Sequence, residues 1–463
     1  MSTTIACNRW IDLSLILTEG DSAAYFIEVG LDIVGRTKFG AFPLHGKFLN
    51  VRAATNGEIH GNAEIKNLVK ILGLEFGKKY TTDDDMNTLR YGKVLIMTDQ
   101  DHDGSHIKGL FINFIHFLWP TLLKMNFVQQ FITPILKVTK GTFKRPFYSE
   151  LEYEDWRQKT TNYRSYNTKY YKGLATSTSK EAIEYFSDID HHRIDIEYNG
   201  KEDDDAFNLA FNPEYIAAKR EWILKEMCTG IRKNGQKLAF LYGHMTKKIS
   251  MNEFVKQELI NYFIDLNARS LPSLVDGFKT AQRKIIFTCF TQNDDSETKV
   301  THLAGFTAQC TAYRHGGRYL MPLIIKLGQN FIGTTPPLGV APLTYDHYNI
   351  NLLLPIGQFG TRLLGGVDAA SPRYIATKLN PLTRKLLLPI DDPLLIYQYE
   401  NNKIIEPDYY VPIIPLVLVN GTEGIGNGWQ TKIPKYNPRE IVANIKRIRR
   451  TLNSTNEGLN CRG

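Results

Sequence analysis

The sequence of 463 residues lacks a long uninterrupted apolar run. The longest candidate, residues 107–125, is broken by Lys108, Asn113, His116 and Pro120, whereas a membrane-spanning helix needs about 20 consecutive apolar residues. The N-terminus also lacks a basic segment followed by an apolar one, so no signal peptide is expected. These two absences predict an intracellular protein with no membrane partner.

Cysteine is scarce as well. The chain has 5 cysteines, and none of them lies in a CxxC pair. This spacing fits neither a zinc site nor a disulfide framework, and it favours reduced intracellular thiols. Glycine (35) and proline (20) are too few for a fibrous or low-complexity chain. The length instead predicts about three compact domains.

Negative charge is in slight deficit. Lys and Arg number 56 against 48 for Asp and Glu, which gives a net charge of +8. This excess permits a polyanionic partner such as nucleic acid without requiring one. The placement of the charges therefore has to decide between these possibilities.

Two short apolar segments, Ser14–Thr18 and Lys93–Thr98, have the length of buried strands, and acids follow each of them. These acids are Glu19, Asp99, Asp101 and Asp103. The apolar spacing after the second group predicts a helix that ends at Trp119-Pro120. The second group therefore lies in a strand-to-helix turn, where ligands bind in open α/β sheets.

Carboxylates at one edge of a sheet repel one another unless a cation binds between them. Oxygen ligands suit Mg²⁺, with Mn²⁺ or Ca²⁺ as substitutes, and such ions are often shared with substrate phosphates. The acids thus predict a site for phosphodiester chemistry, and a surface acidic turn is the alternative. An EF-hand is excluded because Leu110 stands where its loop needs Glu. A zinc pair of His102 and His106 is excluded on the expectation that Gly104 and Ser105 interrupt any helix there.

Four segments follow one another in a distinctive order. They are Glu19-Gly-Asp-Ser-Ala, Phe42-Pro-Leu-His-Gly-Lys-Phe-Leu-Asn-Val-Arg, Asp99-x-Asp-x-Asp-Gly-Ser-His-Ile and Tyr170-Tyr-Lys-Gly-Leu-Ala-Thr-Ser. Together they resemble the toprim region of type IIA DNA topoisomerases, closest to the eukaryotic and large-DNA-virus enzymes. Primases and some nucleases share toprim alone, but not this series. The resemblance covers nearly the whole chain, and it implies that the four acids hold Mg²⁺.

The candidate nucleophile is Tyr374, in Ala370-Ser-Pro-Arg-Tyr. Only about one unperturbed tyrosine in a thousand is ionised at neutral pH, but a guanidinium such as that of Arg373 can stabilise both a tyrosinate and a phosphate. The pair resembles the family's active-site arginine and tyrosine, which implies attack on DNA and a 5′-phosphotyrosyl bond. His315, in Tyr313-Arg-His-Gly, is similar to the family's histidine that supports the transition state.

Basic residues after Arg269 form a turn and a basic helix start, and helix N-termini with basic side chains favour phosphate. In the family this segment leads into a winged-helix domain, which implies that Arg283 and Lys284 contact the DNA backbone. The resemblance also implies DNA contacts by Lys47 and Asn50. Ile425, between glycines, matches the family's apolar wedge that kinks DNA.

The fold class implied is multidomain α/β plus α+β. The expected parts are a Rossmann-like toprim metal-binding domain (1–150), a toprim extension and linker (151–248), a winged-helix domain with the catalytic tyrosine (249–395) and a partial tower domain (396–463). In the last part, Val411–Val419 is expected to form Pro-rich strands that lead into a glycine-rich turn at 421–428. A helix is predicted from Pro438, with Asn437 as its N-cap.

The function implied is the DNA cleavage and religation core of an ATP-dependent type II topoisomerase, an isomerase that passes one duplex through a transient double-strand break. The implied partners are double-stranded DNA and a second copy of the chain, each Tyr374 working with the other copy's acids. No ATPase motif is recognised, so ATP is expected to act only through a domain outside this sequence. The alternatives are a Mg²⁺-dependent toprim nuclease and a non-catalytic DNA-binding scaffold.

The sequence departs from the family pattern at four places. His45 replaces Arg, Ala175 replaces Gly, Thr280-Ala281 replaces Pro-Gly, and residues 334–343 resemble an insertion. None of these changes removes a catalytic group. They favour a divergent member such as a viral one, located in the nucleus if cellular, and in the nucleus or at a cytoplasmic replication site if viral.

Overall fold

The structure is a computed structural model that describes residues 13–20, 24–171, 173–232, 241–242, 246–292, 296–313, 315–329, 350–400 and 403–460. The described residues up to Asp265 form one compact unit, and those from Leu266 form a second. Among the described residues, no helix is long and apolar enough to cross a membrane. The expected insertion at 334–343 lies outside the described residues, and the domain boundaries at 150, 248 and 395 stay predictions.

A six-stranded sheet is the centre of the first unit. Its strands lie in the order β2 (Phe39–Leu44), β1 (Ser14–Glu19), β3 (Lys93–Met97), β4 (Val128–Phe131), β8 (Arg193–Glu197) and β9 (Lys248–Ser250). All neighbouring strands pair in parallel except β4 and β8. The two predicted strands are therefore confirmed. They lie side by side with Thr18 opposite Met97, so the acids that follow them meet at one edge of the sheet.

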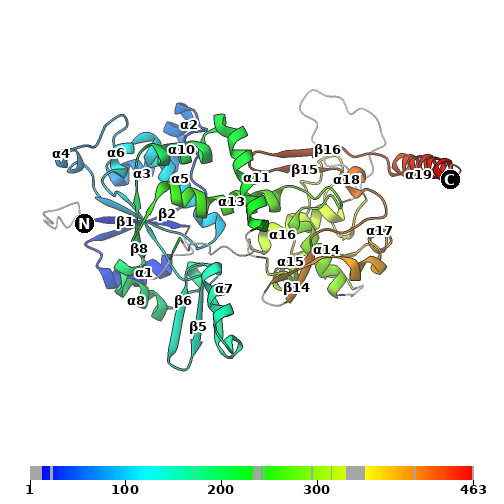
Figure 1. Cartoon of the computed structure of the whole chain (residues 1–463), viewed down its shortest axis with the longest axis horizontal. Helices are drawn as coiled ribbons and strands as arrows, with labels where there is room; N and C mark the ends of the chain where they lie inside the picture. The colour runs from blue at the N-terminus through cyan, green and yellow to red at the C-terminus, as the bar shows by residue number, and fades with distance from the viewer. Residues whose placement is uncertain are drawn as a thin grey trace. The chain divides into compact units, whose positions relative to one another are not determined.

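Helices cover both faces of this sheet (Figure 1). On one face lie α1 (Ala24–Val34) and α8 (Ser179–Ser187), and on the other lie α3 (Ala63–Leu72), α5 (His102–Leu118) and α10 (Lys201–Phe211). The first face has a core in which Ile16 and Leu95 of the sheet pack with Phe26 of α1 and Phe186 of α8. The sequence implied an α/β unit here, and that expectation is confirmed.

The helix α5 corrects one expectation. Gly104 and Ser105 do not interrupt it, because it already begins at His102, and Asp101 caps it by accepting the Gly104 N–H at 2.7 Å. The predicted end of this helix before Trp119 is confirmed. His106 stacks on Tyr262, with ring centroids 3.9 Å apart.

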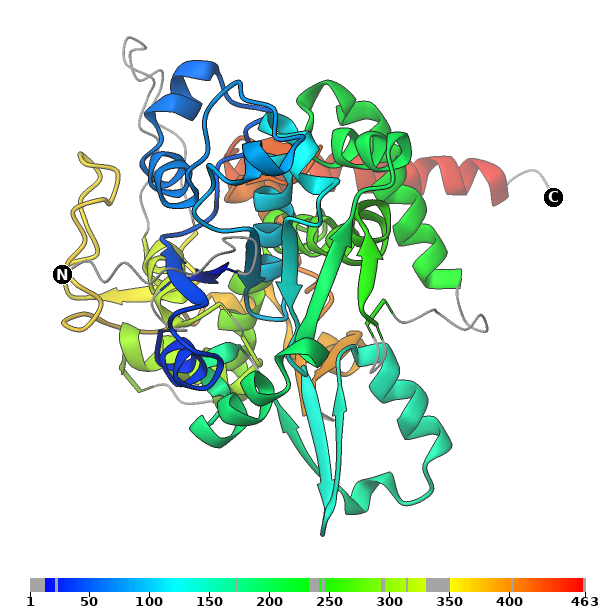
Figure 2. The ribbon, with the colours of Figure 1, turned by 90° about the vertical axis from the view of Figure 1, so that its left-hand side faces the viewer.

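A smaller sheet projects from the main one (Figure 2). It has the order β6 (Phe143–Phe147), β5 (Leu136–Lys140) and β7 (Asn167–Tyr170), and α7 (Glu150–Lys159) packs on it. The remaining α-helices of this unit are α2 (Asn56–Gly61), α4 (Asp83–Met86), α6 (Pro120–Leu123), α9 (Ile189–His192), α11 (Ile216–Arg232), α12 (Met251–Glu253) and α13 (Ile260–Ser270), which runs into the second unit. The described residues also form a π-helix (Phe254–Leu259) and the 3-10 helices Tyr163–Ser165, Leu174–Thr176 and Pro213–Tyr215. The helix α11 lies within residues 151–248, for which the extension and linker stay a prediction.

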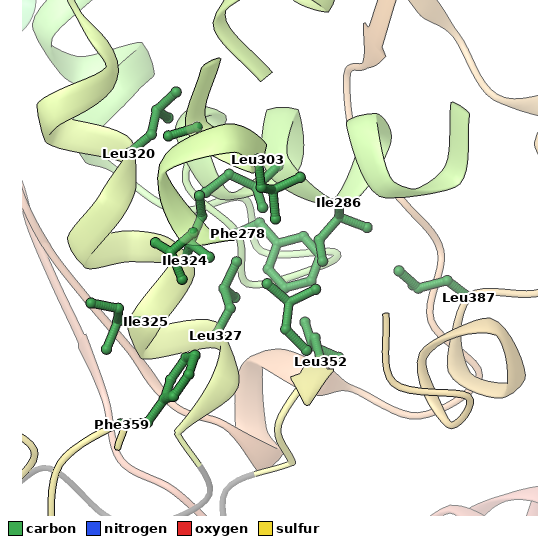
Figure 3. Packing of buried hydrophobic residues seen from close by; sticks show 14 of the residues in the cluster. Phe278, Ile286, Leu303, Leu320, Ile324, Ile325, Leu327, Leu352, Phe359 and Leu387 are labelled. Atoms are coloured by element: carbon green, nitrogen blue, oxygen red, sulfur yellow. The ribbon is translucent and has the colours of Figure 1, made fainter. Parts of the chain in front are cut away.

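The second unit is built on three helices, α14 (Thr280–Gln292), α15 (Val300–Cys310) and α16 (Gly317–Gly328). Their apolar faces meet in a core where Phe278, Ile286, Leu303 and Ile324 interlock (Figure 3). A three-stranded sheet has the order β10 (Thr298–Lys299), β12 (Ala376–Leu379) and β11 (Leu353–Ile356). Tyr374 directly precedes the buried Ile375 at the start of this sheet.

The C-terminal part of the second unit has two hairpins, three α-helices and a 3-10 helix (Pro389–Leu394) among the described residues. These are β13 (Tyr397–Glu400) with β14 (Lys403–Pro407), β15 (Thr422–Ile425) with β16 (Gln430–Ile433), α17 (Thr383–Leu386), α18 (Leu416–Val419) and α19 (Pro438–Asn460). The predicted start of α19 is confirmed, and Asn437 Oδ1 accepts the Arg439 N–H at 2.9 Å.

Two expectations about the segment before α19 are wrong. Val411–Val419 forms no strand, because Pro412 and Pro415 offer no N–H for a sheet, and the apolar residues after Pro415 are buried as the short helix α18. The glycine-rich segment 421–428 is more than a turn, since Thr422–Ile425 is the first strand of a hairpin.

Candidate active site

The four predicted acids lie at the C-terminal edge of β1 and β3. Glu19 is the last residue of β1, Asp99 follows β3, Asp101 caps α5 and Asp103 lies in its first turn. Burial, followed by the charges of Asp101, Asp99 and Asp103, raises the pKa of Glu19 to about 7, although Lys47 opposes this shift. Burial also raises the pKa of Asp99, and so does Asp101. The acids therefore repel one another, as the sequence predicted.

Three of these carboxylates have partners within the unit. Asp99 Oδ1 accepts the Leu174 N–H at 2.7 Å, and Asp103 Oδ1 lies 2.5 Å from Lys47 Nζ. Asp101 is occupied with its helix cap. Glu19 Oε2 is buried and has no hydrogen-bond partner among the described residues.

These acids fit a divalent cation in two respects. A buried carboxylate oxygen without a partner is costly, and so are repelling carboxylates, and a cation would relieve both costs. Among the described residues, no three His, Cys, Asp or Glu side chains already converge as metal ligands. Lys47 and the Leu174 amide instead satisfy part of the cluster.

Lys47 contacts this cluster, whereas Asn50 has its partners elsewhere in the unit. Lys47 Nζ is also 3.2 Å from the hydroxyl of Tyr262, which the sequence did not suggest as a partner. Asn50 Nδ2 donates to the Phe211 carbonyl at 2.9 Å, and Asn50 Oδ1 accepts from Asn113 at 3.0 Å. Lys47 thus belongs to the acid cluster, while Asn50 joins α10 to α5.

Tyr374 lies in a turn of the second unit and is 72% exposed. Its N–H donates to the Ser371 carbonyl at 2.9 Å. The Arg373 guanidinium lies over the Tyr374 ring, 4.7 Å from its centroid. The predicted nucleophile is therefore accessible and has a cation beside it.

His315 belongs to the same unit and contacts Arg269, whose Nη1 is 3.0 Å from His315 Nε2. Its ring also meets Tyr313 edge-on, with centroids 5.5 Å apart. The sequence singled out both Arg269 and His315 but did not pair them.

Arg283 and Lys284 have acidic partners inside the second unit. Arg283 Nε lies 2.8 Å from Asp276, and both side chains are buried. Lys284 Nζ lies 2.7 Å from the buried Glu406. The sequence did not identify either partner. Glu406 is distant from Lys284 in the chain, and Asp276 lies in a turn without a distinctive pattern.

Ile425 is the last residue of β15 and is 68% exposed. A Cβ atom on Gly424 would lie 2.4 Å from the Ser270 carbonyl oxygen, and one on Gly426 would lie 2.4 Å from Asn267 Oδ1. The two glycines therefore let the hairpin pack closely on α13 while Ile425 points outward. His45 Nδ1 lies 3.2 Å from Glu64 Oε1.

Comparison with protein families defines the class of this fold. The Toprim domain matches residues 14–132, and the C-terminal associated domain of TOPRIM matches 131–267. The family of the DNA gyrase/topoisomerase IV A subunits matches 269–457. A toprim domain followed by a gyrase A-like domain is the arrangement of a DNA topoisomerase cleavage core.

Individual proteins are similar over almost all of the chain. DNA topoisomerase 2 top-2 of Caenorhabditis elegans is 53% identical over 437 residues, which is 94% of this chain and 28% of that protein. DNA topoisomerase 2-alpha of Homo sapiens is 51% identical over 439 residues, again 94% and 28%. The crystal structure of the Plasmodium falciparum topoisomerase II DNA-binding, cleavage and re-ligation domain matches with a TM-score of 0.75 and 44% identity, covering 95% of this chain and 57% of that one.

The chain therefore belongs to the type II DNA topoisomerases and corresponds to their cleavage and religation core. It spans about 28% of the length of the curated relatives it matches. Toprim domains of this family use a divalent metal, and the acids at the edge of β1 and β3 fit that use.

Proposed function

We propose that this chain cleaves and rejoins double-stranded DNA through a covalent bond to Tyr374. The observation that carries the proposal is an exposed tyrosine beneath an arginine, in a chain that corresponds to a topoisomerase cleavage core. The phenolic oxygen of Tyr374 attacks a backbone phosphorus and loses its proton. The 3′-oxygen of the neighbouring nucleotide leaves and is protonated, so that the 5′-phosphate stays on the protein. Religation reverses these steps.

The charged residues would assist this exchange in different ways. Arg373 stabilises the forming tyrosinate and the phosphate charge, and His315, held by Arg269, donates a hydrogen bond to the phosphate. Glu19, Asp99, Asp101 and Asp103 would hold Mg²⁺. This ion neutralises charge on the phosphate and on the leaving oxygen when it is bound.

The finer fold and the DNA contacts are part of the same proposal. We assign residues 249–395 to a winged-helix domain and residues 396–463 to the start of a tower domain. Lys47 and Asn50 contact DNA beside the acids, and Ile425 inserts as a wedge. Arg283 and Lys284 were expected to contact phosphates directly. Because both are paired with buried acids, their part is to hold the N-terminal end of α14, which faces the DNA.

The whole protein is proposed to act as a homodimer that opens both strands and passes a second duplex, driven by ATP bound outside this chain. By itself the chain is expected to cleave and religate without hydrolysing ATP. Because the chemistry requires access to genomic DNA, we propose the nucleus as its location. The viral origin expected from the sequence stays a prediction.

The test is to incubate the chain with labelled duplex DNA and Mg²⁺, denature the mixture, and look for protein attached to DNA 5′ ends. The expected result is a covalent adduct that chelation prevents and that Tyr374→Phe abolishes. Tyr319→Phe is the matched control, because Tyr319 is 70% exposed in the same unit and has no arginine over its ring among the described contacts.

Other results would support the alternatives. Free cut ends without an adduct, unaffected by Tyr374→Phe, would indicate a nuclease that uses water. Retention of uncut DNA would indicate a scaffold without catalytic activity.

A further inference from the structure

The carboxylate of Asp99 lies directly against the main chain at Gly173 and Leu174. Its Oδ1 accepts the Leu174 N–H at 2.7 Å. A Cβ atom on Gly173 would lie 2.3 Å from Asp99 Oδ2 and 2.6 Å from Asp99 Cγ. Any side chain at residue 173 would therefore push the carboxylate away. The absence of a side chain at residue 173 is what permits this pose of Asp99.

Hydrogen bonds and burial fix the position of the turn that makes this contact. Thr176 donates to the Gly173 carbonyl both from its N–H, at 3.0 Å, and from its hydroxyl, at 2.6 Å. The Leu174 side chain is buried in the core with Phe26 and Phe186. The Leu174 amide is thus fixed relative to the sheet that carries Asp99.

Glu181 binds both ends of the segment that contains this turn. On the upstream side it accepts hydrogen bonds from Lys169 Nζ, at 2.8 Å, and from the Tyr171 hydroxyl. On the downstream side it accepts from the N–H and hydroxyl of Thr178, at 2.8 and 3.0 Å. Burial opposes its ionisation, but the bonds from Lys169, Thr178 and Tyr171 together lower the pKa of Glu181 to about 2. A single carboxylate thus joins Lys169 and Tyr171 to Thr178.

We propose that the Gly173–Leu174 turn positions Asp99 for the divalent cation, and that Glu181 is a positioning residue that holds the turn in place. The inference rests on the proposed function only in taking Asp99 as one of the metal-binding acids. Partners that orient a ligand from outside the metal site typically change metal affinity by about 10- to 100-fold. The turn supplies such a partner through its backbone, with Glu181 one step further out.

The experiment measures Mn²⁺ affinity of the whole chain without DNA, by the loss of the free-ion electron paramagnetic resonance signal. We expect Gly173→Ala to weaken Mn²⁺ binding by about tenfold or more, and Glu181→Gln to weaken it by about threefold. The Mg²⁺ concentration for half-maximal adduct formation should rise in the same order. A melting curve for each variant reports whether the fold is kept.

Two matched controls come from the same unit. Gly57→Ala adds a methyl group in α2 where a Cβ atom meets nothing within 4 Å. Glu184→Gln changes an exposed acid on the same helix as Glu181. The Nζ atom of Lys137 lies 3.4 Å from Glu184 Oε2. Both variants are expected to bind Mn²⁺ like the unchanged chain.

An unchanged Mn²⁺ affinity in folded Gly173→Ala overturns the proposal. If that variant does not fold, Glu181→Gln decides, and unchanged affinity there overturns it as well. A chain whose Mn²⁺ affinity falls in these variants but which never forms a DNA adduct supports the positioning role and refutes the proposed function. Normal adducts with unchanged affinity refute the positioning role alone, and a chain that binds no Mn²⁺ refutes both.

Discussion

The sequence and the structure indicate different partners for Arg283 and Lys284. In the sequence they are two adjacent cations at a helix start, which is a common phosphate-binding pattern. In the structure each faces an acid with little or no solvent exposure, Asp276 for Arg283 and Glu406 for Lys284. A buried charge needs such a partner, because leaving it uncompensated costs several kcal/mol. Pairing across the fold was invisible in the sequence because Glu406 lies far from Lys284 along the chain.

Lys219 is another buried basic residue, and it contacts a backbone carbonyl and an aromatic ring. It is on α11, its Nζ donates to the Ala210 carbonyl at 2.5 Å, and it lies over the Phe263 ring, 3.8 Å from the centroid. Burial lowers the pKa of Lys219 to about 7. The unfolded chain, with an ordinary lysine pKa near 10.4, therefore binds more protons than the folded chain between about pH 7 and 10.

This difference predicts that the stability contributed at Lys219 rises with pH across that range, by up to about 1.4 kcal/mol per pH unit. Lys219→Met has no such term. Its advantage over the unchanged chain in melting temperature should be largest near pH 7 and should shrink as the pH rises to 9. Lys225→Met, on an exposed position of the same helix, is the control. Melting temperatures of Lys219→Met and the unchanged chain that stay parallel from pH 7 to 9 would contradict the prediction.

At the scale of elements, the sequence located those with clear periodicity and clear ends. The strands β1 and β3, the helix α5 and the start of α19 all follow from apolar spacing bounded by acids, Pro or an N-cap residue. The short helix α18 was missed because four apolar residues cannot be assigned to a strand or a helix by periodicity. Gly104 predicts an interruption by its low helix propensity, but the Asp101 cap offsets that cost in the first turn of α5.

The candidate site was predictable to a similar degree. Acids at strand ends could be found without knowing the fold, since parallel strands bring such residues to one edge. The partners Leu174 and Tyr262 could not, because each comes from a segment distant in the chain and acts through a backbone amide or a single hydroxyl. Tyr374, Arg373, His315 and Ile425 were identified through the resemblance, not through their local pattern.

The position of Ile425 on the hairpin of β15 and β16 leads to a prediction about DNA bending. Ile425 is 68% exposed at the end of β15, opposite Gln430. If it enters a base step, Ile425→Ala should reduce DNA bending, because the smaller side chain cannot keep the bases unstacked. Energy transfer between dyes at the two ends of a bound duplex measures the bend.

Ile404→Ala is the control for this measurement, since Ile404 is 53% exposed on the other hairpin. It should leave energy transfer unchanged, and DNA affinity should fall by less than about tenfold in either variant. Equal bending by the unchanged chain and Ile425→Ala would show that the wedge is elsewhere.

At the scale of the whole molecule, the net charge of +8 has a clearer meaning than composition alone could give. Some of the acids gather in the cluster of the first unit. Some of the cations, such as Arg283 and Lys284, form ion pairs with the buried acids Asp276 and Glu406 inside the second unit. The net charge alone therefore does not show which cations are available to a polyanionic partner.

The two units also allow a test of the proposed dimer. Tyr374 belongs to the second unit and the acids to the first, so the tyrosine of one copy can work with the acids of the other. Tyr374→Phe and Asp99→Asn chains, co-expressed with different tags and purified as the mixed pair, should form an adduct on one DNA strand only. Each variant alone should form none. A mixed pair without any adduct would mean that each copy uses its own acids.

The parallel pairing of β1 and β3 has a consequence for the newly made protein. Glu19 and Asp99 come together only after the chain between them has been synthesised and both strands have joined one sheet, and closing such a loop is among the slower and costlier steps of folding. Tyr374 is made later still. A ribosome-bound chain that ends before Tyr374 lacks the nucleophile, and a chain in which β1 and β3 have not paired lacks the assembled acid cluster. The protein is therefore expected to be harmless to DNA until both units are complete.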